Sequence, residues 1–270
     1  MYIDYHLHSH FSCDSKNDLN NICLTACQMG IDEIAVTDHV DYSYPTPKPH
    51  HTIGDLEQYI EVVQYFQEKH QSQLTIRLGV EIGLEPHYFA EIDQLLQKYP
   101  FDFVIGSVHE VDSLAVSRAP FFAGKTKLEA YTNYYTAILN NIREFQNFDV
   151  LGHLDYCKRY CPIPYETDDQ WLANELVTEI FQTLIKYGKG IEVNTSGFRH
   201  TSQICMPHPD IIRQYYNLGG RCITVGSDSH HTKYISLKAK ETHQILQEIG
   251  FTHISTFEQR KEIRVPLFSD

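Results

Sequence analysis

The sequence predicts an α/β fold in which strand and helix alternate along the 270 residues. Three observations predict it. Short apolar or β-branched segments recur along the chain, longer segments with helical character separate them, and the length suffices to bury the core of one large domain. Because alternating strands and helices favour parallel pairing, we expect one domain over residues 1–270, built as a βα barrel.

The expected strands are the segments in which apolar and β-branched residues cluster. They cover residues 2–7, 33–37, 75–82, 103–108, 150–152, 190–194 and 222–226. The helices expected between and after them cover residues 19–29, 55–70, 88–98, 129–145, 168–187, 210–218 and 237–249. Residues 44–51, which include three prolines, are expected to form a rigid surface loop.

Several helix ends carry their own signals. Gly30 and Gly188 are expected just beyond helix C-termini, where glycine adopts the left-handed conformation. Asp55 and Asp168 are expected as N-caps, and Pro209 belongs in a first turn. These signals fix most of the helix boundaries.

Composition limits the classes of partner. The formal net charge is −13 and no cluster of Lys and Arg appears, which argues against a nucleic-acid partner. A small anionic substrate remains compatible, because bound divalent cations would reverse the local potential. Sixteen histidines are many for this length, so their positions matter.

The chain has the features of a cytoplasmic protein. No apolar run reaches the roughly 18 residues that a membrane span needs, and the N-terminus lacks a basic segment followed by an apolar one. Seven cysteines scattered through a chain of this size indicate reduced thiols. We therefore expect no membrane association.

Metal-ligating residues occur at the C-terminal ends of six of the seven expected strands. These ends carry His6 and His8, Asp38 and His39, Glu81, His109, His153 and Asp155, and Asp228 and His230. The remaining strand carries Glu192 and Asn194, a weaker signal. In a βα barrel these ends meet at the rim that holds the active site.

The spacing within these pairs suits metal binding. In His6-x-His8 and Asp228-x-His230 the i, i+2 spacing places both side chains on one face of an extended segment. Imidazole and carboxylate together suit zinc, iron or manganese, and Asp14 could complete a site in the following loop.

Each residue alone also has an ordinary structural explanation. Glu81 could be a buried ion-pair partner, and His109 or His153 a hydrogen-bonded core histidine. Independent accidents would not gather such residues at one end of nearly every strand, so we predict a metal centre. Histidines away from these ends, His70 and His243 among them, are expected to be solvated.

The same motifs resemble the PHP (polymerase and histidinol phosphatase) superfamily. The matching segments are residues 6–9, 37–39, 79–81, 106–109, 152–155 and 226–230, in the expected order. Within the superfamily, residues 11–14, 80–83 and 194–199 look most like those of histidinol-phosphate phosphatases.

The resemblance implies a distorted (βα)7, TIM-like barrel with two or three divalent metal ions. One ion would be held by His6, His8, Glu81 and Asp228, a second by Glu81, His109 and His153, and a third by Asp14, His39 and His230. The implied reaction is hydrolysis of L-histidinol phosphate in histidine biosynthesis.

Such a centre suits a phosphate monoester, because metal ions neutralise the anionic oxygens and ionise a water that attacks phosphorus. Arg159 and Arg199 are expected near the same rim, and the guanidinium fork matches phosphate oxygens. A surface ion pair is the alternative for Arg159.

Three further roles are less specific. Asp38, His231 and a metal-bound water are alternative proton donors to the leaving alcohol, and Asp38 and Asp155 are candidates for orienting ligand histidines. Glu110 either binds the ammonium group of the substrate or faces solvent.

Two other functions compete with this prediction. One is a different PHP-type phosphoesterase, such as a phosphotyrosine phosphatase or a nuclease. The other is a non-catalytic metal-binding protein, which would bind metal without turnover. The oligomeric state is left open by the sequence.

Overall fold

The structure is a computed structural model that describes residues 1–43, 51–200 and 203–267. Nine strands of this described part form the main sheet. The loop predicted at 44–51 falls outside the described residues except for its last position, where a short strand begins. Among the described helices, none combines the length and the apolar character that crossing a bilayer requires.

Seven parallel strands form the wall of the barrel, in the order in which the chain visits them. They are β1 (Ile3–Leu7), β2 (Glu33–Val36), β5 (Thr75–Gly83), β6 (Phe103–Ser107), β9 (Val150–Leu151), β10 (Gly190–Asn194) and β11 (Ile223–Gly226). All seven predicted strands are therefore present, and the α/β prediction is confirmed.

The first and last of these strands nearly close the barrel. Beyond the end of β11, Ser229 forms a parallel bridge with Leu7 of β1. The N–H of His8 donates to the carbonyl of Ser229 at 3.0 Å. Lower in the same seam, the carboxylate of Asp4 accepts the N–H of Ser227 at 2.8 Å. The first and last strands of the wall therefore meet along one seam.

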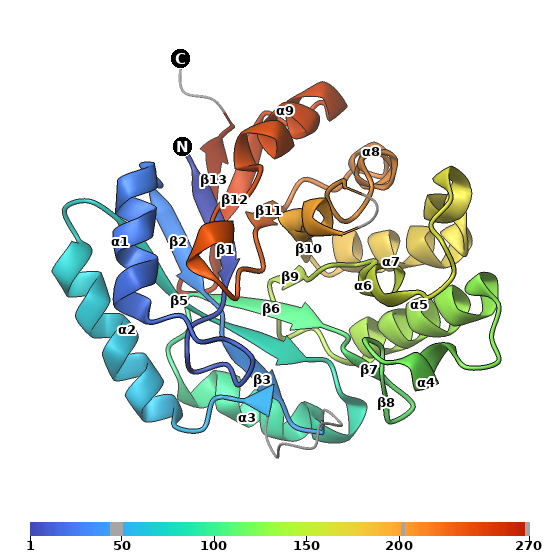
Figure 1. The fold of residues 1–270 in the computed structure, drawn as a ribbon, viewed down its shortest axis with the longest axis horizontal. Helices are drawn as coiled ribbons and strands as arrows, with labels where there is room; N and C mark the ends of the chain where they lie inside the picture. Colours follow the sequence, from blue (N-terminus) through green and yellow to red (C-terminus); the bar gives the residue numbers. More distant parts are fainter. Residues whose placement is uncertain (44–50, 201–202, 268–270) are drawn as a thin grey trace.

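The helices surround these strands (Figure 1). The seven predicted helices appear as α1 (Leu19–Met29), α2 (Leu56–His70), α3 (Phe89–Lys98), α5 (Lys127–Glu144), α7 (Asn174–Lys186), α8 (Pro209–Asn217) and α9 (Ala239–Ile249). Two short helices, α4 (Ala119–Phe122) and α6 (Tyr156–Tyr160), lie between them. The apolar faces of the long helices pack onto the outer side of the strands, because a parallel sheet is buried on both faces.

Most of the helix-end predictions are confirmed. Gly30 follows α1 with φ of 68°, and Gly188 follows α7 with φ of 67°. Asp55 caps α2 by accepting the N–H of Gln58, and Pro209 opens α8.

The prediction that Asp168 caps a helix is wrong. Asp168 lies in the 3-10 turn Thr167–Trp171, and α7 begins later, at Asn174. The neighbouring Asp169 explains the difference, because its carboxylate accepts the N–H of Glu166 and pairs with Lys127 at 2.7 Å. Those contacts hold the segment in a tight turn.

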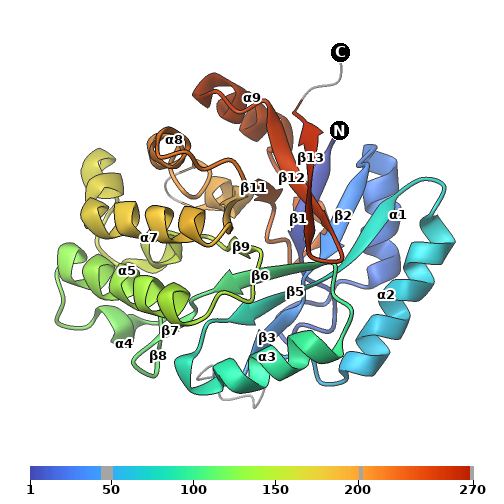
Figure 2. The ribbon, with the colours of Figure 1, turned by 180° about the vertical axis from the view of Figure 1, so that it is seen from behind.

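Short antiparallel strands were not predicted. They are β3 (His39–Asp41) with β4 (His51–Thr52), β7 (Glu110–Val111) with β8 (Leu114–Ala115), and β12 (His253–Glu258) with β13 (Lys261–Pro266). The β12–β13 hairpin lies beside β1 (Figure 2), where the N–H of Phe257 donates to the hydroxyl of Tyr5 at 3.0 Å. Its turn reaches the N-terminal ends of β6 and β9, where the N–H of Gln259 donates to Asp102 at 3.0 Å and Arg260 donates to Asp149 at 2.6 Å.

Two histidines expected to be solvated are buried instead. His70 on α2 is 8% exposed and His243 on α9 is 1% exposed. The ring of His243 stacks on Tyr2 with ring centroids 5.9 Å apart. His70 faces α1, where its Nδ1 lies 3.8 Å from Sγ of Cys27.

Candidate metal centre

The predicted ligands meet at the C-terminal rim of the barrel. Four groups in the described residues bring at least three ligand atoms within 4.8 Å of one another. The groups are His6, His8 and Glu81; Glu81, His109 and His153; His8, His39 and His230; and His39, Asp41 and His109. The groups share members, so they form one continuous cluster.

Glu81 lies at the centre of this cluster. Its Oε2 is 3.2 Å from Nε2 of His6 and 3.5 Å from Nε2 of His8. Its Oε1 is 2.9 Å from Nε2 of His153 and 3.3 Å from Nε2 of His109. The two oxygens therefore face two separate histidine pairs, as expected of a carboxylate that bridges two ions.

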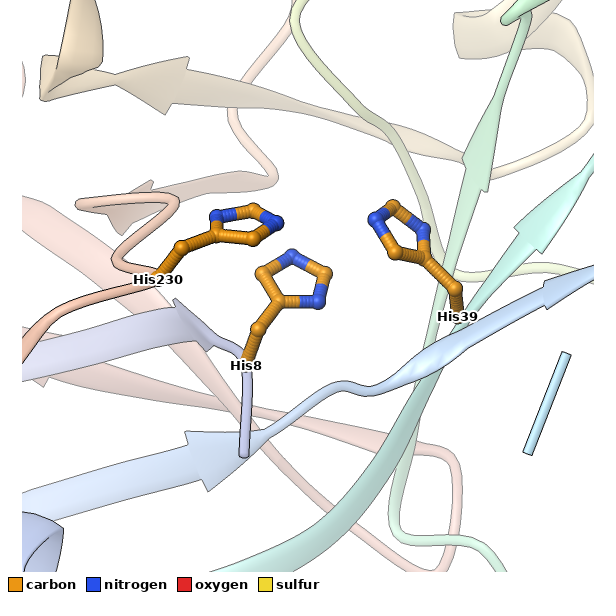
Figure 3. A group of neighbouring side chains, drawn as sticks. All are labelled: His8, His39 and His230. Carbon is orange, nitrogen blue, oxygen red and sulfur yellow. The ribbon is translucent and has the colours of Figure 1, made fainter. Parts of the chain in front are cut away.

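The third group lies at the mouth of the cluster. The rings of His8, His39 and His230 converge, although their strands are far apart in the sequence (Figure 3). The Oδ2 of Asp14 is 3.1 Å from Nε2 of His230 and 3.7 Å from Nε2 of His39. Asp14 is half exposed there, with 41% of its side chain accessible.

Asp228 lies between the first and third groups. Its Oδ1 is 3.6 Å from Nε2 of His8 and 3.5 Å from Nδ1 of His230. The backbone of Asp228 adopts φ of 52°, in a left-handed region that Asp tolerates better than most residues. All nine residues predicted as ligands are thus brought together.

The arrangement of donor atoms fits bound cations. The Nε2 atoms of His6 and His8 face each other at 3.0 Å, and those of His109 and His153 at 3.3 Å. Two imidazole nitrogens gain little from facing each other directly, whereas both can donate lone pairs to one cation. The buried Oε2 of Glu81 also lies 2.9 Å from Nδ1 of His39, so three imidazole rings surround this one oxygen.

The charges of the cluster depend on each other. Burial raises the pKa of the Glu81 carboxyl, but the rings of His6 and His39 outweigh burial and hold that pKa well below its usual range. Burial lowers the pKa of His6, and the carboxylates of Glu192 and Glu81 hold it well above its ordinary value. The buried carboxylates therefore require positive charge, which protons supply in the metal-free protein and cations would supply in their place.

Two carboxylates orient the ligand rings from outside. The Oε1 of Glu192 is 2.6 Å from Nδ1 of His6, and the Oδ1 of Asp41 is 2.9 Å from Nδ1 of His109. Each contact fixes a ring so that its Nε2 faces the cluster. Asp41 was missed from the sequence, although its i, i+2 spacing from His39 is the signal used for His6 and His8.

Asp38 lies beneath the cluster. Its carboxylate is fully buried and accepts hydrogen bonds from the hydroxyl of Ser9 at 2.7 Å and the N–H of Ser12 at 3.0 Å. The hydroxyl of Ser12 also lies 3.0 Å from Nδ1 of His8. Asp38 therefore positions His8 through Ser12, as predicted for a residue that orients a ligand histidine, and its alternative role as proton donor stays a prediction.

The other two candidates for auxiliary roles, His231 and Asp155, contact residues that are not ligands. His231 is exposed, and its ring accepts the N–H of Lys233 at the start of the turn Thr232–Tyr234. Asp155 was expected to orient a ligand histidine, but no such contact is present in the described part of the chain. Its nearest charged partner is Lys158, 3.9 Å away. Glu192 and Asp41 perform that role instead, because their strands end beside the rings.

Both predicted arginines reach the cluster at Asp228. An Nη atom of Arg159 donates to Oδ2 of Asp228 at 3.1 Å, and Arg199 donates to the backbone carbonyl of Asp228 at 3.0 Å. The Arg159 side chain is only 5% exposed, so it is not a surface ion pair. Two guanidinium groups therefore flank the ligand cluster on one side.

Glu110 lies immediately after His109, at the start of β7. Its carboxylate accepts a hydrogen bond from the hydroxyl of Ser43 at 3.4 Å, and its side chain is partly buried. Burial raises the pKa of Glu110. The hydrogen bond with Ser43 places Glu110 beside the segment that follows β3, whereas Arg159 contacts Asp228.

Comparison with known proteins agrees with this geometry. The PHP domain family matches residues 4–196. The histidinol-phosphatase of Lactococcus lactis subsp. lactis is 32% identical over 96% of this chain and 95% of its own length. The histidinol-phosphatase of Bacillus subtilis is 24% identical over 73% of this chain and 82% of its own length.

Solved structures show the same architecture. The crystal structure of histidinol phosphate phosphatase from Lactococcus lactis, complexed with zinc, L-histidinol and phosphate, superposes with a TM-score of 0.88. It is 33% identical, and the match covers 97% of this chain and 98% of that one. A structure of a putative histidinol phosphatase from Listeria monocytogenes, 19% identical over 88% of this chain and 99% of that one, shares the fold with a TM-score of 0.78. The chain belongs to the PHP domain family.

Proposed function

We propose that this protein is a metal-dependent phosphomonoesterase that hydrolyses L-histidinol phosphate to L-histidinol and phosphate. One observation carries the proposal: Glu81 joins two histidine pairs in a buried cluster that two arginines flank at Asp228. The similar enzyme of Lactococcus lactis, which has been solved with zinc, L-histidinol and phosphate, supports the choice of substrate.

The ligand set suits two or three divalent ions of zinc, iron or manganese. His6, His8, Glu81 and Asp228 would hold one ion; Glu81, His109 and His153 a second; and Asp14, His39 and His230 a third. Bound there, such ions would supply positive charge and lower the pKa of a water molecule.

The chain's own residues perform the remaining tasks. Arg159 and Arg199 would bind phosphate oxygens, because the guanidinium fork matches them in geometry and charge. The Arg159 guanidinium also stacks on Tyr156, 5.1 Å from the ring centroid, which limits its movement. Because the Arg159 guanidinium is already held in place, it would lose little conformational entropy when phosphate binds. It could then stabilise the negative charge that develops on the phosphoryl oxygens during transfer.

A test compares three substrates on the purified, metal-loaded protein. We expect phosphate release from L-histidinol phosphate to exceed release from phosphotyrosine by at least about tenfold, and no cleavage of a single-stranded oligonucleotide. Faster turnover of either rival substrate would reassign the function within the family. Metal binding without turnover of any ester would favour the non-catalytic reading.

A variant pair links turnover to the metal cluster. Glu81→Gln should lose bound metal and activity together, because a neutral amide cannot bridge two cations. Glu144→Gln, at an exposed position near the end of α5, serves as the matched control and should retain both. Full activity of Glu81→Gln would remove the cluster from the mechanism.

A further inference from the structure

The second strand of the β12–β13 hairpin forms an open sheet edge. In the described part of the chain β13 pairs with β12 alone, and the consecutive residues from Lys261 to Arg264 are exposed. Ile263, in the middle of this segment, is 39% exposed. A two-stranded sheet is only marginally stable by itself, and an open edge presents backbone groups that another strand can bind.

The pairing within the hairpin decides which backbone groups of β13 face outward. Phe257 of β12 lies opposite Glu262 of β13, but the N–H of Phe257 donates to the hydroxyl of Tyr5 at 3.0 Å. Phe257 and Glu262 are therefore a non-hydrogen-bonded pair, in which each residue turns its backbone groups away from the other strand. Because such pairs alternate along an antiparallel ladder, Arg264 has the same orientation as Glu262.

The outward backbone groups of Glu262 and Arg264 are available to a partner. Among the residues that the structure describes, none forms a hydrogen bond with the backbone N–H or C=O of either residue. The next outward position is Pro266, which has no N–H to donate, so the usable edge ends there. The free edge is therefore short and is centred on Ile263.

We propose that β13 pairs with β13 of a second copy of this chain, antiparallel and centred on Ile263, so that two hairpins form one four-stranded sheet across a two-fold axis. In this pairing Glu262 of each copy lies opposite Arg264 of the other, and both pairs are hydrogen-bonded pairs of the new ladder. The two Ile263 side chains meet on the other face of the sheet, since neighbouring residues of a strand point to opposite faces.

The charges of the edge select this partner and this register. The side chain of Arg264 is 59% exposed and that of Glu262 is 28% exposed, so both can reach across to a neighbouring strand. Opposite charges directly across a strand pair stabilise it, and like charges destabilise it. A pairing centred on Glu262 or on Arg264 would set two like charges opposite each other. The edge is therefore complementary to a second copy of itself when Ile263 lies on the axis.

The pairing leaves the metal centre open. The turn between β12 and β13 contacts Asp102 and Asp149, which precede β6 and β9. The ligands His109 and His153 follow the other ends of the same two strands. The rate of phosphate release per copy should therefore be the same in the monomer and in the dimer. The pairing does not depend on the proposed function, and the two can fail separately.

Charge reversal tests the register. In sedimentation velocity on the metal-loaded protein, the wild type should shift from one copy to two between about 5 and 500 µM, because a short edge contact is weak. Arg264→Glu and Glu262→Arg should each weaken association at least about tenfold, and the double variant should return to within about threefold of the wild type. Glu248→Arg, at an exposed position on α9, changes the net charge equally and should associate like the wild type. A wild type that stays monomeric at the highest concentration, or a double variant as weak as the single ones, would overturn the proposal.

A disulfide tests the two-fold axis directly. The two copies of residue 263 would form a non-hydrogen-bonded pair with Cα atoms about 4.5 Å apart, within the range that a disulfide spans. Ile263→Cys should therefore form a covalent dimer with diamide, which takes up two electrons and two protons as the two thiols join. Lys261→Cys, on the same face of β13 but away from the axis, should not exceed the wild type, whose exposed Cys13 sets the background. Equal crosslinking of the two variants, or none above background in Ile263→Cys, would rule out this pairing.

Discussion

The carboxylate of Glu192 lies 2.6 Å from Nδ1 of His6, on the far side of the ring from the metal cluster. Its second oxygen accepts the backbone N–H of His153 at 2.8 Å. One carboxylate on β10 therefore holds ligands from β1 and from the end of β9 in register. A contact of this kind fixes the tautomer of the ring and raises its basicity toward a metal.

Glu192→Gln should weaken metal binding by about 10- to 100-fold, since the amide is a poorer acceptor for the ring N–H and cannot balance its charge. Metal content after dialysis against a graded chelator series measures the effect. The control is Glu248→Gln, at an exposed position on α9. Unchanged metal retention in Glu192→Gln would show that packing alone orients His6.

Arg199→Ala should raise KM for the phosphate ester by roughly 10- to 100-fold and leave metal content intact, because Arg199 contacts the backbone of Asp228 and no ligand atom. Steady-state kinetics with metal analysis of the same samples provides the measurement. Arg213→Ala, at an exposed position on α8, is the matched control. A KM equal to that of the wild type would exclude Arg199 from the phosphate site.

Gly226→Ala should disturb the metal centre by steric contact. A Cβ atom at Gly226 would lie 2.4 Å from Cβ of His6 and 2.6 Å from Oε1 of Glu192, closer than such atoms can approach. We expect a loss of about 1 to 3 kcal/mol in the free energy of unfolding and weaker metal retention. Denaturant unfolding and metal analysis measure the two effects. Gly54→Ala, where a Cβ meets nothing within 4 Å, should change neither.

The rim ligands were predictable from the sequence because parallel strands deliver their C-terminal residues to one place. His39 shows how far this reasoning reaches: it pairs with Glu81 in register, so two residues 42 positions apart become neighbours. The barrel and the ligand set both follow from this alternation of strands and helices.

The residues that contact the metal ligands were harder to predict from the sequence. Asp38 and Asp41 lie close together in the sequence, yet Asp38 contacts Ser9 and Ser12 while Asp41 contacts the rings of His39 and His109. The short strand β3 decides which carboxylate faces the cluster, and three residues carry too weak a pattern to predict it. Asp155 likewise lines a cavity together with residues far from it in the chain, Tyr131 and His208 among them.

The last prediction concerns His243, which the sequence placed in solvent and the structure places beneath α9. Burial, with a smaller contribution from the N-terminal ammonium, lowers the pKa of His243 from 6.5 to about 4. A histidine with a depressed pKa in the folded state stabilises the fold while it is neutral. Its contribution is therefore complete above pH 6.5 and is lost as the pH falls from 6.5 toward 4.

The wild-type protein should lose on the order of 2 to 3 kcal/mol of unfolding free energy from this residue over that interval. His243→Leu has no ring to protonate. Between pH 6.5 and 4, its free energy of unfolding should therefore fall by less than that of the wild type, and the difference should be about that amount. Urea unfolding at a series of pH values, with metal removed from every sample, measures the difference. His253→Gln, at an exposed position on β12, should follow the wild type. The metal-site histidines titrate alike in both proteins, so their contribution cancels in the comparison. If the free energy of unfolding depends on pH in the same way in His243→Leu and in the wild type, His243 does not have a depressed pKa in the folded protein.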